Sequence, residues 1–78
     1  MNFTIYSKGG CPYCEKVKKV LELTNLTFVE YTLSSDFTKE EFYSEFGEGA
    51  TFPQIVCKDQ KIGGCTDTIN YLKQNNIL

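Results

Sequence analysis

The sequence predicts an α/β protein in which a four-stranded mixed β-sheet is flanked by three α-helices. Three patterns lead to this prediction. Apolar residues alternate near the start of the chain, recur at helical spacing directly afterwards, and form a short paired stretch near the end. A period of two is typical of strands and a period near 3.6 is typical of helices. The expected order is βαβ, then a helix, then a β-hairpin, then a last helix.

The first part of the chain predicts a strand–helix–strand unit. A strand is expected over residues 2–7, and two glycines in residues 8–10 end it. A helix is expected from Pro12 to about Thr24, because the N–H that proline lacks would be unpaired at the first helical position anyway. A second strand is expected over residues 27–33, parallel to the first through a right-handed crossover. The apolar residues at helical spacing are Val17, Val20 and Leu21.

The second part of the chain predicts a helix, a hairpin and a final helix. Thr38 and Glu41 have the spacing of a capping box, which predicts a helix to about Phe46. The remaining elements are a strand over 54–57, a return strand over 61–62 and an amphipathic helix over 66–74. Taken together, this order of elements is that of a thioredoxin fold.

Length and composition indicate one domain over residues 1–78. Hydrophobic residues make up 41% of the chain, which suffices for a single core without disulfide staples. The net charge is −2 and there is no basic patch, so no nucleic-acid partner is expected. The Lys16–Lys19 cluster is expected to form a solvated helix face. The chain shows neither a secretory leader nor an apolar run long enough to cross a bilayer. We therefore expect no membrane association and a cytoplasmic location (the host cytoplasm for a viral source).

Two of the four cysteines, Cys11 and Cys14, form a Cys-X-X-Cys motif between a strand and a helix. A bridge between them closes too small a loop to add much stability, which favours a reactive pair. At the start of a helix, unpaired N–H groups and the helix dipole stabilise a thiolate, the nucleophile of disulfide exchange. Cys11 is therefore the expected nucleophile, and Cys14, one turn deeper, the expected resolving thiol.

A structural zinc site is the main alternative for this motif. Zinc usually takes four Cys or His ligands. The chain has no histidine, and Cys57 and Cys65 do not form a second Cys-X-X-Cys pair. No metal is therefore expected, and Cys57 is expected to pack as a small hydrophobic residue.

Three segments resemble those of the dithiol glutaredoxins. Tyr6–Cys14 is similar to their active-site segment, Thr51–Ile55 to their cis-proline segment, and Gly63–Asp67 to their glycine-pair and Asp motif. The segments follow the family's order and spacing over essentially the whole chain. The resemblance implies a glutathione-dependent thiol–disulfide oxidoreductase, with glutathione as the reducing co-substrate.

The resemblance also implies how glutathione is bound. The sulfur of glutathione would bond to Cys11, and its glycine carboxylate would lie near Lys8. The ring of Tyr13 would line the groove that holds the tripeptide. A cis peptide bond before Pro53 would let the Phe52 backbone pair with the cysteine of glutathione. Two of these assignments have an alternative interpretation: Lys8 could be a solvated loop residue, and the Tyr13 ring could simply pack on the surface. Thr51 flanks the cis-proline segment.

The last motif would hold the γ-glutamyl end of glutathione. Gly64 would let glutathione approach the backbone closely. The start of the last helix would bind the γ-glutamyl carboxylate, and Asp67 would bind the ammonium group. Thr66 and Asp67 could equally be helix caps. Cys65 lies beside the site and is either a redox-active thiol or an inert packing residue.

Two positions depart from the commoner family pattern. Many glutaredoxins carry a basic residue just before the cis-proline segment, where this chain has Gly47-Glu48-Gly49-Ala50. Phe52 is bulkier than the usual valine. Both departures bear on how tightly glutathione is held.

The predicted reaction is reduction of protein–glutathione mixed disulfides and of protein disulfides by a monomeric enzyme. Ribonucleotide reductase, a host protein and a general pool of glutathionylated proteins are all compatible partners. Three alternatives are a thioredoxin-reductase-dependent small redoxin, an iron–sulfur carrier that uses Cys11 and glutathione as ligands, and a pure interaction module. The last two are not enzymes. Absorbance of a bound cluster would identify the iron–sulfur carrier, and the absence of activity in a thiol assay would identify the interaction module.

Overall fold

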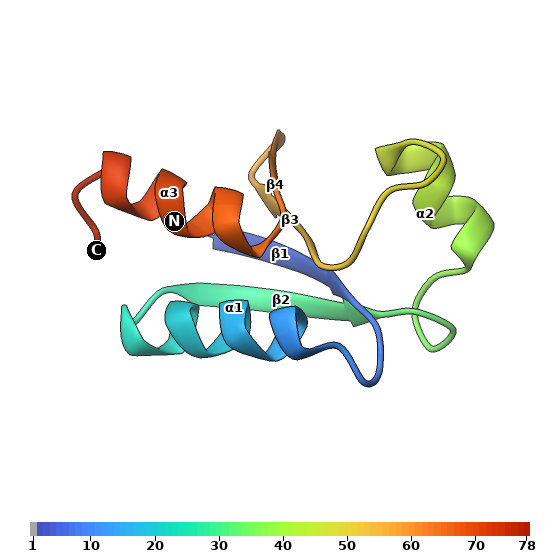
Figure 1. Cartoon of the computed structure of the whole chain (residues 1–78), viewed down its shortest axis with the longest axis horizontal. Coiled ribbons are helices and arrows are strands. Elements are labelled where there is room, and N and C mark those ends of the chain that lie inside the picture. The colour runs from blue at the N-terminus through green and yellow to red at the C-terminus, as the bar shows by residue number, and fades with distance from the viewer. Residues whose placement is uncertain (1) are drawn as a thin grey trace.

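The computed structural model describes residues 2–78 and confirms the predicted order of elements (Figure 1). Several predicted ends are wrong by one residue; the second strand, for example, stops at Thr32 because Leu33 forms an isolated bridge with Phe37. The elements are β1 (Asn2–Ser7), α1 (Pro12–Leu23), β2 (Thr27–Thr32), α2 (Lys39–Phe46), β3 (Gln54–Cys57), β4 (Gln60–Gly63) and α3 (Cys65–Gln74).

The four strands form one mixed sheet in the order β2-β1-β3-β4. β1 and β2 are parallel, with Ile5 opposite Glu30, and α1 makes the crossover between them. β3 is antiparallel to both β1 and β4, as the predicted hairpin requires. The active-site loop therefore leaves the carboxyl end of a central strand.

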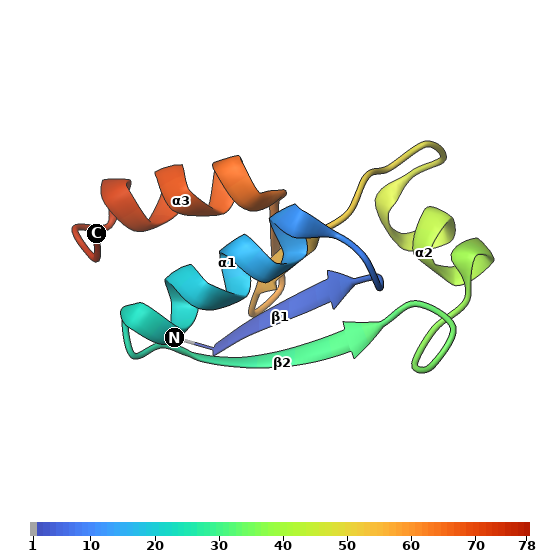
Figure 2. The same cartoon turned by 60° about the horizontal axis from the view of Figure 1, so that its bottom comes forward.

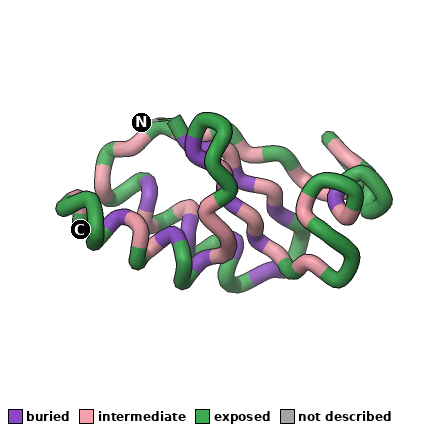
Figure 3. Tube along the Cα trace, turned by 90° about the horizontal axis from the view of Figure 1, so that it is seen from above, coloured by how far each residue is buried: buried purple, intermediate pink, exposed green. Residues whose placement is uncertain are grey.

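The core lies between the sheet and the paired helices α1 and α3, which run side by side on one face (Figure 2). β1 turns alternate side chains into it, so buried and partly exposed residues alternate along the strand (Figure 3). This core is strongly apolar, and its largest fully buried members are Phe3, Ile5, Val17, Leu21, Ile55 and Leu72.

Helix α2 lies apart, beyond the carboxyl ends of β1 and β2 (Figure 2). Aromatic rings link it to the rest of the chain. The ring of Phe46 lies 5.0 Å from that of Tyr6 on β1. Phe42, which is buried, stacks on Phe52 with 4.1 Å between ring centroids and 10° between planes. Stacked rings at this separation add to simple burial, so α2 supports the segment that precedes Pro53.

Within residues 2–78 no helix combines the length and apolar character that a membrane span requires.

Candidate active site

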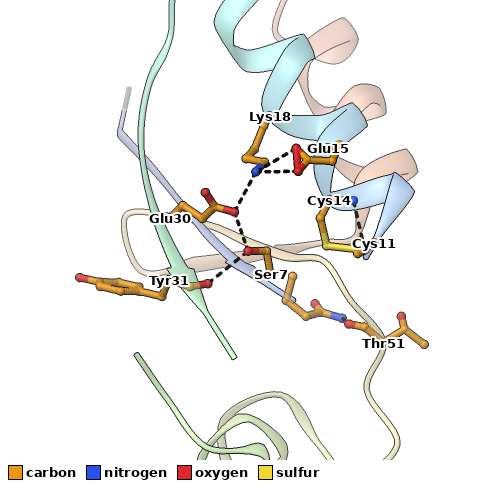
Figure 4. The surroundings of a disulfide bond; sticks show 9 residues. Ser7, Cys11, Cys14, Glu15, Lys18, Glu30, Tyr31 and Thr51 are labelled. Atoms are coloured by element: carbon orange, nitrogen blue, oxygen red, sulfur yellow. Dashed lines mark hydrogen bonds and ion pairs between the residues drawn. A yellow bond between two sulfur atoms is a disulfide. The ribbon is translucent and has the colours of Figure 1, made fainter. Parts of the chain in front are cut away.

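Cys11 is the N-cap of α1, as the sequence predicts. Gly10 adopts φ of 68°, which lets the loop turn into the helix, and Pro12 occupies the first helical position. The Cys11 sulfur accepts a hydrogen bond of 3.2 Å from the backbone N–H of Cys14. Cys11 and Cys14 form a disulfide with 5.2 Å between their Cα atoms (Figure 4).

This position suits a thiolate at Cys11. The first N–H groups of a helix have no partner within the helix, and the positive end of the dipole lies there. A sulfur that caps these groups is stabilised more as an anion than as a thiol. Cys11 keeps 8% of its surface exposed and Cys14 only 1%, so the first sulfur is the more accessible one. Both observations agree with Cys11 as attacking and Cys14 as resolving group.

A hollow beside the pair brings together eight of the nine residues predicted to contact glutathione. It lies between the first turn of α1, the segment before β3 and the start of α3. The peptide bond between two of its lining residues, Phe52 and Pro53, is cis, as the resemblance implies. We call it the α3 hollow; it is lined by Tyr13, Thr51, Phe52, Pro53, Gly64, Cys65, Thr66 and Asp67.

Lys8, the ninth predicted residue, lines a second hollow on the other side of Thr51 and Phe52. Its ammonium group lies 5.5 Å from the centre of the Phe52 ring, within the range of a cation–π contact. Lys39, from the first turn of α2, is the other charged residue of this surface. We call it the basic hollow; it is lined by Lys8, Leu33, Lys39, Tyr43, Ala50, Thr51 and Phe52.

The two hollows differ in charge. Asp67 is the charged residue of the α3 hollow, whereas Lys8 and Lys39 are those of the basic hollow. Lys39 was not predicted from the sequence. Its place in the first turn of α2 follows from the cap at Thr38, but its closeness to Thr51 depends on how α2 folds back over the chain.

The glycine pair at the start of α3 has a steric requirement at Gly63. Its φ is 122°, and a Cβ there would lie 2.9 Å from the Cβ of Asp67. Gly64 has an ordinary φ of −87°, and its added Cβ would meet the Pro53 carbonyl at 3.5 Å, a normal contact. Within the chain, therefore, Gly63 rather than Gly64 must be glycine. Asp67 accepts a hydrogen bond from the Gly64 N–H at 3.2 Å, the capping role considered for it.

The other two cysteines are buried free thiols. Cys57 packs in the core, as predicted. Cys65 is 5% exposed, and burial raises the pKa of its thiol, although Lys16 opposes the shift. Within residues 2–78 no group of three or more His, Cys, Asp or Glu residues is arranged to hold a metal ion.

The prediction of a fully solvated lysine face is wrong for Lys18. Its side chain retains 20% exposure and lies 2.9 Å from a Glu15 oxygen and 3.0 Å from a Glu30 oxygen. The sequence does not predict the ion pair with Glu30, because that pair depends on how α1 is rotated about its axis where it packs over the edge strand β2. Lys16 and Lys19 are exposed, as predicted.

Comparison with known proteins agrees with this geometry. The sequence profile of the family named Glutaredoxin matches residues 3–62. The chain belongs to the glutaredoxin family. It is 35% identical to Glutaredoxin 1 of Rickettsia prowazekii over 75 residues, which cover 94% of this chain and 79% of that protein. It is 36% identical to Glutaredoxin 3 of Escherichia coli over 66 residues, or 85% of this chain and 80% of the relative.

Solved structures support the same assignment. Reduced Escherichia coli glutaredoxin superposes with a TM-score of 0.82 at 28% identity, with all of both chains covered. A buckwheat glutaredoxin in complex with glutathione has a TM-score of 0.80 at 20% identity and shares the fold; the match covers 96% of this chain and 71% of that one. The predicted thioredoxin fold is confirmed. Glutaredoxins are thiol–disulfide oxidoreductases, so the predicted enzyme class is confirmed as well.

Proposed function

We propose that this glutaredoxin reduces protein–glutathione mixed disulfides through Cys11, with free glutathione as the reductant. The observation that carries the proposal is the Cys11 sulfur at the N-cap of α1, beside a hollow that ends at a second helix N-terminus and a carboxylate. Glutathione is a tripeptide with one free ammonium group and two free carboxylates. A site for it needs both signs of charge, and the two hollows supply them.

In this proposal the γ-glutamyl end of glutathione occupies the α3 hollow. The N–H groups of the first turn of α3 bind its carboxylate, since such groups have no partner within the helix. Asp67 pairs with the ammonium group while it keeps its contact with the Gly64 N–H. The Phe52 backbone pairs with the cysteine of glutathione by strand addition. Tyr13, with 60% of its surface exposed, borders the peptide on the side of α1.

The glycine carboxylate then enters the basic hollow, between Lys8 and Lys39. This placement bears on the acidic Glu48, which stands where many relatives have a basic residue. Glu48 is exposed and does not line the basic hollow, whereas Lys39 does. Two lysines with no acidic residue on the same surface favour a carboxylate there. Lys39 thus supplies the second positive charge that the segment before Thr51 lacks.

The reaction proceeds by two exchanges. The Cys11 thiolate attacks the glutathionyl sulfur, the bond between the two sulfurs of the substrate breaks, and the protein leaves as a thiolate that takes a proton from water. The thiolate of a second glutathione attacks the glutathionyl sulfur on Cys11, which releases glutathione disulfide and restores the Cys11 thiolate. For a protein disulfide, Cys14 displaces the substrate from Cys11, and two glutathiones reduce the resulting Cys11–Cys14 bond.

Protein partners follow from the same chemistry. Glutathionylated proteins and disulfide-bearing proteins such as ribonucleotide reductase are the proposed substrates. We also propose that the enzyme works as a monomer in the cytoplasm, where glutathione keeps thiols reduced. The buckwheat glutaredoxin bound to glutathione supports the choice of co-substrate.

The test is glutathione-dependent reduction of a glutathionylated peptide by wild type, Cys11→Ser and Cys14→Ser. We expect Cys11→Ser to fall to background, and Cys14→Ser to keep substantial turnover because the mixed-disulfide route does not use Cys14. Activity of wild type with thioredoxin reductase but not with glutathione would contradict the glutathione site and leave the fold intact.

A further inference from the structure

One carboxylate contacts both flanks of the loop that carries Cys11. Glu30, on β2, accepts a hydrogen bond of 2.6 Å from the Ser7 hydroxyl through its Oε2 atom. The same oxygen lies 3.0 Å from the Lys18 ammonium. Ser7 is the last residue of β1 and Lys18 lies one turn after Cys14 (Figure 4). We call these two contacts the Glu30 bridge.

The loop between these flanks has little packing of its own. Lys8, Gly9 and Gly10 are exposed. A Cβ added at Gly9 or Gly10 would meet no other atom within 4 Å. Apart from the contact of Lys8 with the Phe52 ring, these loop residues do little to fix Cys11, so its position depends largely on the two elements on either side of the loop.

Apolar packing fixes one part of this geometry. Cys14, Val17 and Leu21 are buried and determine which face of α1 meets the sheet. Hydrophobic contact is non-directional, so it constrains the position of the helix along its axis only weakly. A short, charge-assisted hydrogen bond is directional and stronger. The Glu30 bridge supplies that constraint between α1 and the end of β1.

Ser7 depends on Glu30 for its main hydrogen bond. The residue is 2% exposed, and the other hydrogen bond of its hydroxyl is a long one of 3.5 Å to the Tyr31 carbonyl. A buried hydroxyl without a good partner is costly. The Ser7 hydrogen bond and the Lys18 ion pair lower the pKa of the Glu30 carboxyl, which keeps it ionised.

We propose that Glu30 is a positioning residue that holds Cys11 at the N-cap of α1. It acts on the nucleophile through Ser7 and Lys18 and does not touch the substrate. The proposal rests on Cys11 as the nucleophile, but alkylation of Cys11 by iodoacetamide tests it without glutathione. A failure of the glutathione site therefore leaves this test unaffected.

The sign of the effect separates positioning from simple charge. Removal of a nearby carboxylate, through Coulomb's law alone, makes a thiolate easier to form and lowers the pKa of Cys11. Loss of the N-cap geometry weakens the hydrogen bond to the sulfur and raises that pKa. Positioning and charge thus predict opposite shifts for the same substitution.

The experiment measures the pH profile of Cys11 alkylation in a Cys14→Ser background, with Cys11 identified by peptide mass spectrometry. We expect Glu30→Leu and Ser7→Ala to raise the pKa and to slow alkylation below it by about fivefold, the factor for one weakened hydrogen bond. Glu30→Gln retains an acceptor for Ser7, so its Cys11 pKa should lie between that of these variants and that of wild type. Glu45→Gln is the matched control, because Glu45 pairs with Lys61 and not with α1.

Coupling gives a second test that does not depend on one variant folding well. Ser7→Ala and Lys18→Met act through the same carboxylate, so their effects on the Cys11 pKa should not add, and each should nearly vanish in a Glu30→Leu background, which has no acceptor. An unchanged or lowered Cys11 pKa in both Glu30→Leu and Ser7→Ala, with or without a lower melting temperature, overturns the proposal. Additive effects of Ser7→Ala and Lys18→Met overturn it as well.

Discussion

Helices α1 and α3 both begin beside the Thr51–Pro53 segment, and each has a cysteine at its start. Cys11 is the N-cap of α1, and its sulfur accepts the N–H of Cys14. At α3 the N-cap is Gly64, and Cys65 is the first helical residue. The Cys65 side chain is buried, and burial raises the pKa of its thiol.

The two cysteines therefore differ by one position relative to the helix start: Cys11 is at the N-cap, and Cys65 is at the first helical position. A side chain at the N-cap can reach the unpaired N–H groups of the first turn, whereas a side chain at the next position points away from them. At α1 those groups stabilise the enzyme's own thiolate. At α3 the N-cap residue Gly64 has no side chain, and Asp67 bonds only the Gly64 N–H, which leaves the N–H groups of the first turn for the substrate anion proposed above.

The largest expected effect compares serine substitutions of these two cysteines. Cys11→Ser should abolish turnover of a glutathionylated peptide, because it removes the nucleophile. Cys65→Ser should keep at least half of the wild-type rate, since its thiol takes no part in the exchange. Loss of activity in a folded Cys65→Ser variant would contradict the assigned difference between the helix ends.

Substitutions in the two hollows should change binding of glutathione more than the chemical step. Asp67→Asn keeps an acceptor for the Gly64 N–H but loses the ammonium partner, so we expect KM for glutathione to rise about tenfold. Lys39→Gln should raise KM about threefold, with a smaller effect at high salt, because an exposed charge is screened. In both variants kcat should change little. Lys19→Gln, an exposed lysine on α1, is the control, and an equal rise in KM there would contradict a local role for Lys39.

Phe52 lies between the hollows, and its ring should matter more for stability than for catalysis. Phe52→Val removes the stack with Phe42 and should cost about 1 kcal/mol. For a domain of this size that lowers Tm by roughly 4–8 °C. Thermal unfolding measures the change, with Leu23→Ala as an exposed control expected to leave Tm nearly unchanged.

The smallest expected effect concerns stability in acid and involves Glu30, which joins α1 to the end of β1. Hydrogen bonding from Ser7, together with the Lys18 ion pair, holds the pKa of Glu30 below its usual value of 4.5. Its contribution to stability is present above the unfolded-state pKa and is lost as pH falls through the lower, folded-state pKa. Wild type should thus be more stable than Glu30→Gln near neutral pH, and urea unfolding should show the gap closing in acid. A gap that widens in acid contradicts the assigned shift.

Local signals in the sequence determined much of this architecture. Two glycines followed by Pro12 predict a loop and a helix start, and they place Cys11 at the cap. Thr38 and Glu41 predict the start of α2, where the capping box is present. These features involve residues a few positions apart, which is the range over which caps and turns act.

Features that depend on packing were not predicted. Lys39 and Thr51 line the same hollow only because aromatic rings hold α2 over the chain. Lys18 and Glu30 meet only because of the rotation of α1 and the position of β2. The same holds for Gly63, which must be glycine both because its φ is 122° and because the Asp67 side chain folds back on it. Each requires the relative placement of elements that the periodicity leaves open.

The most direct test of the account compares the reactivity of Cys11 and Cys65 in one sample of the reduced protein. A brief pulse of iodoacetamide near neutral pH, followed by peptide mass spectrometry, gives the alkylation rate at each cysteine. We expect Cys11 to react at least ~10-fold faster than Cys65, because only its thiolate is stabilised at a helix cap. Equal rates, or faster reaction at Cys65, would contradict the claim that the N-cap position makes Cys11 the nucleophile.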